Sequence, residues 1–147
     1  MLEGYSDSNW ISNANELYAT SGYVFTIGGG VISWMSCKQT ILMQSTMEAE
    51  LIALDTTTVE AEWLRELLMD LPVVEKPVTA ILMNCDNQTL IVKVNSAKDN
   101  AKSSRHVKRR LKSVRKVEKL QSNKSDLYFN REKPDRSLYK TAFTECD

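Results

Sequence analysis

Hydrophobic positions in the first third of the chain fall into short runs separated by turn residues. After the Ser21-Gly22 pair, residues 23–27 are rich in β-branched and aromatic side chains, and an apolar run at residues 31–35 follows three consecutive glycines. Two such runs around a glycine turn predict a β-hairpin. A shorter candidate strand, residues 2–6, begins almost at the first residue.

A long amphipathic helix is predicted at about residues 46–70. Its start is marked by Ser45 and Glu48, which stand at the spacing of a capping box. Apolar residues then recur at intervals of three, four or seven, which places them on one face of a helix. They are Met47, Leu51, Leu54, Ala61, Leu64 and Leu68.

The second half of the chain continues the alternation of strands and helices. Residues 78–83 form an apolar run that predicts a buried strand, and this strand delivers Asp86 just past its C-terminal end. A short helix is expected at residues 88–94, a helix crowded with Arg and Lys at 103–120, and a last strand at 126–129. A strand that follows a long helix is often parallel to the strand before it, so we expect an α/β fold.

The size and composition fit one globular domain inside the cell. With 147 residues, 42% of them hydrophobic, the chain has material for one core. No apolar run approaches the roughly 20 residues that cross a bilayer, and the first nine residues lack the regions of a signal peptide. Cys37, Cys85 and Cys146 match neither a disulfide framework nor a zinc spacing, so we expect reduced thiols in the cytoplasm or nucleus.

Charge is distributed unevenly, although the formal net charge is zero. Residues 1–100 hold 5 basic and 13 acidic side chains, whereas residues 101–147 hold 14 basic and 6 acidic ones. An acidic part suited to cations, followed by a basic part suited to phosphates, favours nucleic-acid chemistry. Charge alone does not identify the partner.

Three acids stand where a metal site would be built. Asp7 lies at the end of the first candidate strand, Glu50 in the first turns of the long helix, and Asp86 past the later buried strand. Carboxylate oxygens suit Mg²⁺ or Mn²⁺, and the two aspartates would meet if their strands are parallel neighbours. Glu48 competes with Glu50, but the capping box already gives Glu48 a structural role. The residues alone leave open the alternative that Asp7 and Asp86 are ordinary turn and helix-cap residues.

The predicted helix at residues 103–120 is a candidate phosphate-binding surface. Residues 102–119 hold nine cations against one acid, Glu118, which exceeds what solubility needs. Phosphate contacts are the expected use, and a solvated helix face is the alternative. The cations are Lys102, Arg105, Lys108, Arg109, Arg110, Lys112, Arg115, Lys116 and Lys119.

Other polar and aromatic residues have two interpretations. Asn87 and Gln88 either donate to a base edge or a 2′-hydroxyl, or start the following helix. His106, the single histidine, is expected to cap or pack rather than to catalyse. Large aromatic rings usually supply buried area, so the tryptophans are assigned to packing. They are Trp10, Trp34 and Trp63.

Eight short segments stand in a fixed order between residue 4 and about residue 120. They are G-Y-S-D-S-N-W at 4–10, T-S-G-Y-V-F at 20–25, G-G-V-I-S-W at 29–34, C-K-Q-T at 37–40, S-T-M-E-A-E-L-I-A-L at 45–54, E-A-E-W-L-R at 60–65, C-D-N-Q at 85–88 and S-S-R-H at 103–106. No single segment is specific, but their order and spacing together are. In that combination the chain resembles the ribonuclease H domain of copia-type retrotransposon polyproteins.

This resemblance implies the ribonuclease H-like fold, an α/β fold with a mixed five-stranded sheet and helices on both faces. It also implies hydrolysis of the RNA strand of an RNA/DNA hybrid with two Mg²⁺ ions, Mn²⁺ being the alternative. Asp7, Glu50 and Asp86 match the three metal-binding carboxylates of the family. An adjacent reverse transcriptase domain is the implied protein partner.

The end of the chain departs from that family. The family continues with a last strand, a loop and a fourth aspartate in a segment resembling A-D-P-F-T-K, which residues 125–147 lack. One permitted codon choice for these residues, read one base later, gives V-T-Y-I-S-T-E-K-N-L-T-D-P-F-T-K-R-L-S-R-N-V. In this hypothetical shifted frame, the codon of the fourth aspartate overlaps the codons of Arg136 and Ser137. Asp135 lies nearby, but the sequence around it has no helical pattern that would direct its side chain toward the site. We therefore expect a ribonuclease H-like domain at residues 1–124 and an altered, poorly ordered segment at 125–147, with the last strand and helix in doubt.

Three functions are compatible with these observations. The first is a hybrid nuclease of impaired activity, in which Asp7 bridges both metals and Glu50 and Asp86 each help to hold one. The alternative is a catalytically inactive, nucleic-acid-binding relic of a retrotransposon, and a third is a structural domain that supports a neighbouring reverse transcriptase without binding hybrid. The expected nucleic-acid contacts are Asn87, Gln88, Arg105, Arg109, Arg110, Arg115 and Lys116.

Overall fold

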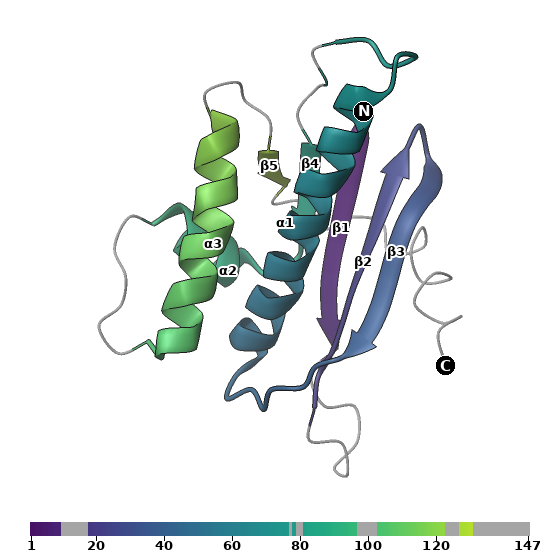
Figure 1. Ribbon diagram of the computed structural model, residues 1–147. Helices are drawn as coiled ribbons and strands as arrows, with labels where there is room; N and C mark the ends of the chain where they lie inside the picture. Colours follow the sequence, from purple (N-terminus) through teal and green to yellow (C-terminus); the bar gives the residue numbers. More distant parts are fainter. Residues whose placement is uncertain (10–17, 77, 79–80, 97–102, 123–126, 131–147) are drawn as a thin grey trace.

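Eight helices and strands make up the described part of the chain. The computed structural model describes residues 1–9, 18–76, 78, 81–96, 103–122 and 127–130 (Figure 1). In chain order the elements are β1 (Leu2–Asn9), β2 (Thr20–Ile27), β3 (Gly30–Lys38), α1 (Thr46–Asp70), β4 (Ile81–Cys85), α2 (Gln88–Asn95), α3 (Arg105–Ser122) and β5 (Leu127–Asn130).

The strands form one mixed sheet in the order β3-β2-β1-β4-β5. β1, β2 and β3 are antiparallel neighbours, whereas β4 pairs in parallel with β1, and β5 with β4. The turn between β2 and β3 uses Gly28 and Gly29 at φ of 57° and 83°, a region that glycine enters at little steric cost. The expected hairpin and the mixed α/β fold class are confirmed.

α1 covers the residues predicted for it. Its start is fixed by hydrogen bonds between residues that are close in the sequence. The N-cap side chain of Ser45 accepts a hydrogen bond from the backbone N–H of Glu48 at 3.2 Å. The Glu48 carboxylate in turn accepts from the backbone N–H of Gln44 at 3.1 Å. α1 then returns the chain to the starting end of β3, so that β4 runs parallel to β1.

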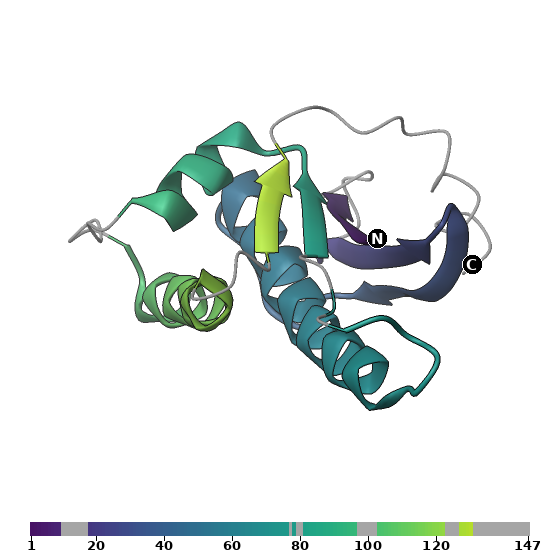
Figure 2. The ribbon, with the colours of Figure 1, turned by 90° about the horizontal axis from the view of Figure 1, so that it is seen from above.

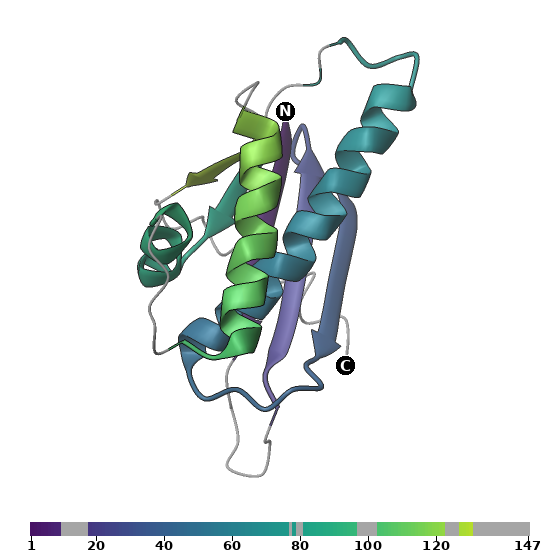
Figure 3. The ribbon, with the colours of Figure 1, turned by 60° about the vertical axis from the view of Figure 1, so that its left-hand side comes forward.

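α1 and α3 lie side by side across one face of the sheet (Figure 3). Leu51 and Leu54 of α1 join Phe25 and Met83 of the sheet in one hydrophobic core, and all four are almost fully buried. A Cβ atom at Gly4 would lie 2.6 Å from the Phe25 ring and 2.7 Å from the Met83 sulfur. Glycine at this position therefore lets the core pack closely against β1. Replacement of Leu51 or Leu54 by alanine should lower the free energy of unfolding by about 2–5 kcal/mol.

The β4–β5 pair lies between the other three strands on one side and α2 and α3 on the other (Figure 2). Arg115 of α3 donates to the carbonyl oxygens of Val94 at 3.0 Å and Lys93 at 2.8 Å. These carbonyls belong to the last turn of α2, where a helix leaves acceptors unsatisfied. One basic side chain thus joins the two helices.

β4 differs from the prediction, since it covers Ile81–Cys85 rather than residues 78–83. Its limits are set by pairing with two strands, since Cys85 lies opposite Ser6 of β1 and Ile81 lies opposite Leu127 of β5. An apolar run in the sequence shows which residues tend to be buried, but the partner strand decides where the ladder ends.

β5 lies in the segment 125–147, where the sequence left the last strand in doubt. It pairs in parallel with β4 and starts one residue later than the predicted strand. Residues 131–147, including Asp135 and the position of the expected last helix, lie outside the described residues. Of the helices that are described, none combines the length and hydrophobicity needed to cross a membrane.

Candidate metal centre

Asp7 and Asp86 stand on neighbouring strands at the same end of the sheet. β1 and β4 are parallel, and Ser6 lies opposite Cys85, so the next residue along each strand direction is an aspartate. The carboxyl ends of parallel strands meet at one edge of a sheet. The topology therefore brings the two carboxylates together.

Glu50 reaches these aspartates from the first turns of α1, which packs against β1. One carboxylate oxygen from each of Asp7, Glu50 and Asp86 lies within 4.8 Å of the other two. Glu50 is only 5% exposed, and the two aspartates are half-buried. The structure thus brings together the three acids chosen from the sequence, while Glu48 remains at the helix cap.

The pKa of Glu50 is raised from 4.5 to about 7. Burial is the largest cause, because a poorly solvated carboxylate resists ionisation. The charges of Asp7 and Asp86 raise the pKa further, and hydrogen bonding by Ser8 lowers it. Glu50 Oε2 is buried and has no hydrogen-bond partner among the described residues. The fold holds three carboxylates together against their mutual repulsion.

The donor atoms at this site fit a hard divalent cation. All three are carboxylate oxygens, the ligands that Mg²⁺ and Mn²⁺ prefer. A cation would offset the repulsion and give the buried Glu50 Oε2 a partner. Burial, followed by the nearby carboxylates, raises the pKa of the adjacent Cys85 thiol to about 12, so this residue offers no thiolate. The site therefore favours ions that take oxygen ligands.

Gln39 links three elements beside Glu50 and was not chosen from the sequence. Its side-chain amide donates to Ser21 Oγ at 2.6 Å and to the Ala49 carbonyl oxygen at 3.1 Å, and its backbone N–H donates to the Ala19 carbonyl oxygen at 2.7 Å. Ala49 precedes Glu50, so this amide holds the first turns of α1 against the start of β2. The sequence signal for it is its place in the C-K-Q-T segment.

The polar pair after Asp86 starts α2. Asn87 is the N-cap residue, and its side-chain oxygen accepts from the backbone N–H of Leu90 at 3.0 Å. Gln88 is the first residue of the helix and is exposed. The helix-starting interpretation holds for Asn87, and contact of either residue with nucleic acid stays a prediction.

The basic residues expected to contact nucleic acid fall into two groups. Arg110 forms a salt bridge with Asp55 of α1 at 2.8 Å, and Arg115 binds the end of α2. These two side chains therefore support the fold. The other three are exposed on α3, and their contacts with nucleic acid stay predictions. They are Arg105, Arg109 and Lys116.

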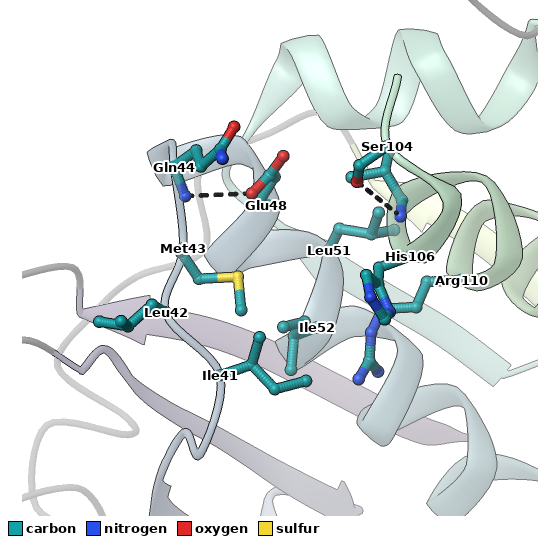
Figure 4. Close-up of a pocket in the computed structure, with 11 residues that line it drawn as sticks. Ile41, Leu42, Met43, Gln44, Glu48, Leu51, Ile52, Ser104, His106 and Arg110 are labelled. Carbon is teal, nitrogen blue, oxygen red and sulfur yellow. Dashed lines mark hydrogen bonds between the residues drawn. The ribbon is translucent and has the colours of Figure 1, made fainter. Parts of the chain in front are cut away.

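A small pocket lies between α3, the start of α1 and the loop before it (Figure 4). Its volume is about 130 Å³, and its lining is mainly apolar and includes Ile41, Ile52 and Val107. His106 is exposed and lines this pocket, whereas none of the three clustered carboxylates does. His106 is therefore not part of the metal centre.

Two tryptophans correct the expectation that these rings pack in the interior. Trp34 is 56% exposed and Trp63 is 55% exposed. Ser33 of β3 donates to Glu60 of α1 at 2.8 Å, so Ser33 faces the helix, and alternation along the strand turns Trp34 the other way. Trp10 and Lys102 lie outside the described residues.

Comparison with known proteins gives partial matches along the chain. No family model matches it. It is 36% identical over 91 residues to the retrovirus-related Pol polyprotein from transposon TNT 1-94 of Nicotiana tabacum, which covers 62% of this chain and 7% of the polyprotein. It is 44% identical over 63 residues to the secreted RxLR effector protein 161 of Plasmopara viticola, which covers 43% of this chain and 44% of that protein. The chain thus spans less than half of either relative.

Solved structures with the same architecture cover most of the chain. RNase H1 from the archaeon Halobacterium salinarum NRC-1 superposes with a TM-score of 0.64 at 16% identity, covering 99% of this chain and 98% of that one. LC11-RNase H1, in complex with an RNA/DNA hybrid, gives a TM-score of 0.60 at 15% identity, covering 91% and 86%. Identity this low establishes the fold alone. The chain therefore has the ribonuclease H fold, and its homologues include retrovirus-related Pol polyproteins of plant transposons, consistent with a ribonuclease H domain of a copia-type polyprotein.

Proposed function

We propose that the chain is a ribonuclease H-type domain that hydrolyses the RNA strand of an RNA/DNA hybrid at a site formed by Asp7, Glu50 and Asp86. The observation that carries this proposal is the convergence of three carboxylates from β1, α1 and the end of β4. The hybrid bound to LC11-RNase H1, which has the same fold, supports this substrate class. Fold alone would not suffice, because one fold hosts many functions.

Each carboxylate has a role that follows from its position. Asp7 lies on β1, next to both α1 and β4, so it would help to hold both ions, while Glu50 and Asp86 would each help to hold one. Two Mg²⁺ ions held there, or Mn²⁺ in their place, would supply an activated water and would stabilise the leaving oxygen of a phosphodiester. The packing around Glu50 and the Gln39 hydrogen bonds hold the carboxylates in position before substrate arrives.

We also propose that hydrolysis by this chain is impaired. The family that the chain resembles has a fourth aspartate at its metal site. Residues 125–147 contain no segment that matches the one carrying this aspartate. Loss of one carboxylate weakens the hold on one ion, so turnover falls even where binding persists. The same departure favours the second candidate, a catalytically inactive relic that binds nucleic acid.

A reverse transcriptase domain is the protein partner that we propose. The chain aligns with 7% of the TNT 1-94 Pol polyprotein, so most of that relative has no counterpart here. A hybrid substrate and such a partner would place the protein in the cytoplasm or nucleus. The division into a domain at residues 1–124 and an altered segment at 125–147 belongs to the same proposal.

Cleavage of labelled hybrid tests these proposals directly. Three proteins are compared with Mg²⁺ and with Mn²⁺: the chain as it stands, its Asp7→Asn variant, and a version in which residues 125–147 carry the shifted reading. We expect weak cleavage by the unaltered chain, no cleavage by Asp7→Asn, and strong cleavage by the version with the shifted reading. Binding of hybrid without cleavage by any of them would favour the relic. Efficient cleavage by the unaltered chain, lost in Asp7→Asn, would refute impairment, and absence of both binding and cleavage would refute both candidates.

A further inference from the structure

The outer side of α3 carries four cations in one line. Arg105, Arg109, Lys112 and Lys116 follow each other at intervals of four, three and four residues. At 3.6 residues per turn these side chains fall within an arc of about 60° and extend about 16 Å along the helix. All four are exposed. We call this row the cationic stripe.

The opposite side of α3 fixes the direction in which the stripe points. Val107, Leu111, Val114 and Val117 are buried in the hydrophobic core, at 5% exposure or less. Rotation of the helix would expose these four side chains to water, which burial of apolar area opposes. The stripe is therefore held on the outside of the protein.

The stripe differs from the other arginines of the same helix. Arg110 and Arg115, which flank it, are bound to Asp55 and to the end of α2. By contrast, no described residue forms an ion pair or a hydrogen bond with the four side chains of the stripe. α3 thus has one set of cations with partners inside the protein and one set directed outward.

A row of like charges has a cost that solubility does not explain. Cations three and four residues apart repel one another and weaken a helix. Scattered charges of mixed sign would give the same solubility without this repulsion. A single anion would engage one or two members of the row, whereas a nucleic-acid strand presents a continuous series of phosphates. The length of the stripe therefore favours a strand of phosphates over a small anion.

We propose that the cationic stripe, with Lys112 included and Arg110 and Arg115 excluded, binds the phosphate backbone of the RNA/DNA hybrid. α3 starts beside the first turns of α1, where Glu48 and His106 line one pocket, so the stripe begins at the end of α1 that carries Glu50 (Figure 4). The identity of the nucleic acid rests on the proposed function. The affinity for phosphates does not, because it needs neither the carboxylates nor a metal.

The test measures hybrid binding in EDTA, where failure of catalysis has no influence on the result. Arg109→Gln/Lys112→Gln is compared with Lys38→Gln/Lys76→Gln, a control that removes two exposed cations outside α3. Anisotropy of labelled hybrid is followed between about 50 and 200 mM salt, and each lost phosphate contact should lower the slope of log affinity against log salt by about 0.7–0.9. We expect the magnitude of this slope to fall by about 1.5 in the stripe variant and by less than about 0.5 in the control.

Replacement of all four stripe residues by Gln should lower the slope by about 3. Helix content and melting temperature are measured in parallel, and the double variant carries the test if the quadruple one does not fold. An unchanged slope in the double variant, or an equal loss in the control, would overturn the proposal. So would competition by polyglutamate as strong as that by duplex DNA, because the partner would then be an acidic protein.

Discussion

The carboxylate centre and the cationic stripe are both groups of like charges, but the protein assembles them in different ways. Asp7, Glu50 and Asp86 come from three elements that are distant in the chain, and the sheet topology brings them within 4.8 Å. The stripe lies within twelve residues of one helix, and the helical repeat alone aligns it. The first group exists only in the folded state, whereas the second forms wherever α3 is helical.

The two groups also differ in what their repulsion costs. Burial raises the pKa of Glu50 to about 7, with a smaller contribution from the charges of Asp7 and Asp86, which neither solvent nor salt screens well there. The stripe is exposed, and salt screens its charges at distances of about 8–10 Å. The buried group should therefore dominate the effects of mutation on catalysis and stability, and the exposed group the response of binding to salt.

Asp7→Asn should have the largest effect. It removes the carboxylate that we assign to both ions, so any hybrid cleavage should fall at least about 1,000-fold, as when one member of an interacting catalytic unit is lost. Hybrid affinity in EDTA should stay the same or rise, because the lost charge repelled phosphates. Single-turnover cleavage and anisotropy measure the two quantities. A loss of both together would mean that Asp7 supports the fold rather than the chemistry.

Glu50→Gln should remove a pH dependence of stability in the metal-free protein. The folded-state pKa lies above the unfolded value, so the proton stabilises the fold below pH 4.5, and this contribution is lost as pH rises to about 7. At 1.36 kcal/mol per unit the loss amounts to about 3 kcal/mol. Urea unfolding in EDTA at pH 4.5 and 8 should show this decrease for the natural chain and not for the variant.

Divalent metal gives the control for this pH effect. Mg²⁺ at 100 times its dissociation constant should restore about 2.7 kcal/mol at pH 8 in the natural chain. The Glu50→Gln variant should gain less, because it offers one charge fewer to the ion. Equal stabilisation of both proteins would place the ion elsewhere.

Local signals made α1 and the basic character of α3 easy to predict. The Ser45 capping box fixed the helix start, and the density of Arg and Lys marked α3 as basic. The stripe itself was not predicted, because the expected contacts included Arg110 and Arg115 and left out Lys112. The carboxylate centre depended on β1 and β4 being parallel neighbours, which no local pattern states, so the residues alone left Asp7 and Asp86 open to a capping interpretation. Only the combination of motifs that resembles a known family favoured the site.

The remaining errors have the same origin in contacts between distant segments. β4 covers Ile81–Cys85 rather than residues 78–83, because pairing with β1 and β5 sets its limits. Nothing around Arg110 in the sequence identifies Asp55 as its partner, and nothing around Gln39 indicates that it holds the start of α1. The exposure of Trp34 likewise follows from which face of β3 meets α1. Sequence patterns supply periodicity, and tertiary pairing decides the rest.

Gln39→Leu tests whether the carboxylate centre depends on its support. Loss of the amide that holds the Ala49 carbonyl should let Glu50 shift and lower Mn²⁺ affinity about 10- to 100-fold, as for other groups that orient metal ligands. Gln44→Leu is the matched control, since Gln44 is exposed in the same loop. Calorimetric titration measures the affinity. An effect of equal size in the control would assign the loss to the loop as a whole.

Arg110→Gln should have the smallest effect, and it separates the two classes of cation on α3. Its salt bridge with Asp55 is partly exposed, at 28% and 17% for the two side chains, so its loss should lower the free energy of unfolding by about 1 kcal/mol. The buried Asp55 Oδ1 already lacks a partner among the described residues, which adds to the cost of removing the arginine. The salt slope of hybrid binding should nevertheless match that of the natural chain, because Arg110 is engaged inside the protein. A slope lowered as far as by a single stripe substitution such as Arg109→Gln would show that the salt bridge opens on binding, and that Arg110 belongs with the phosphate contacts.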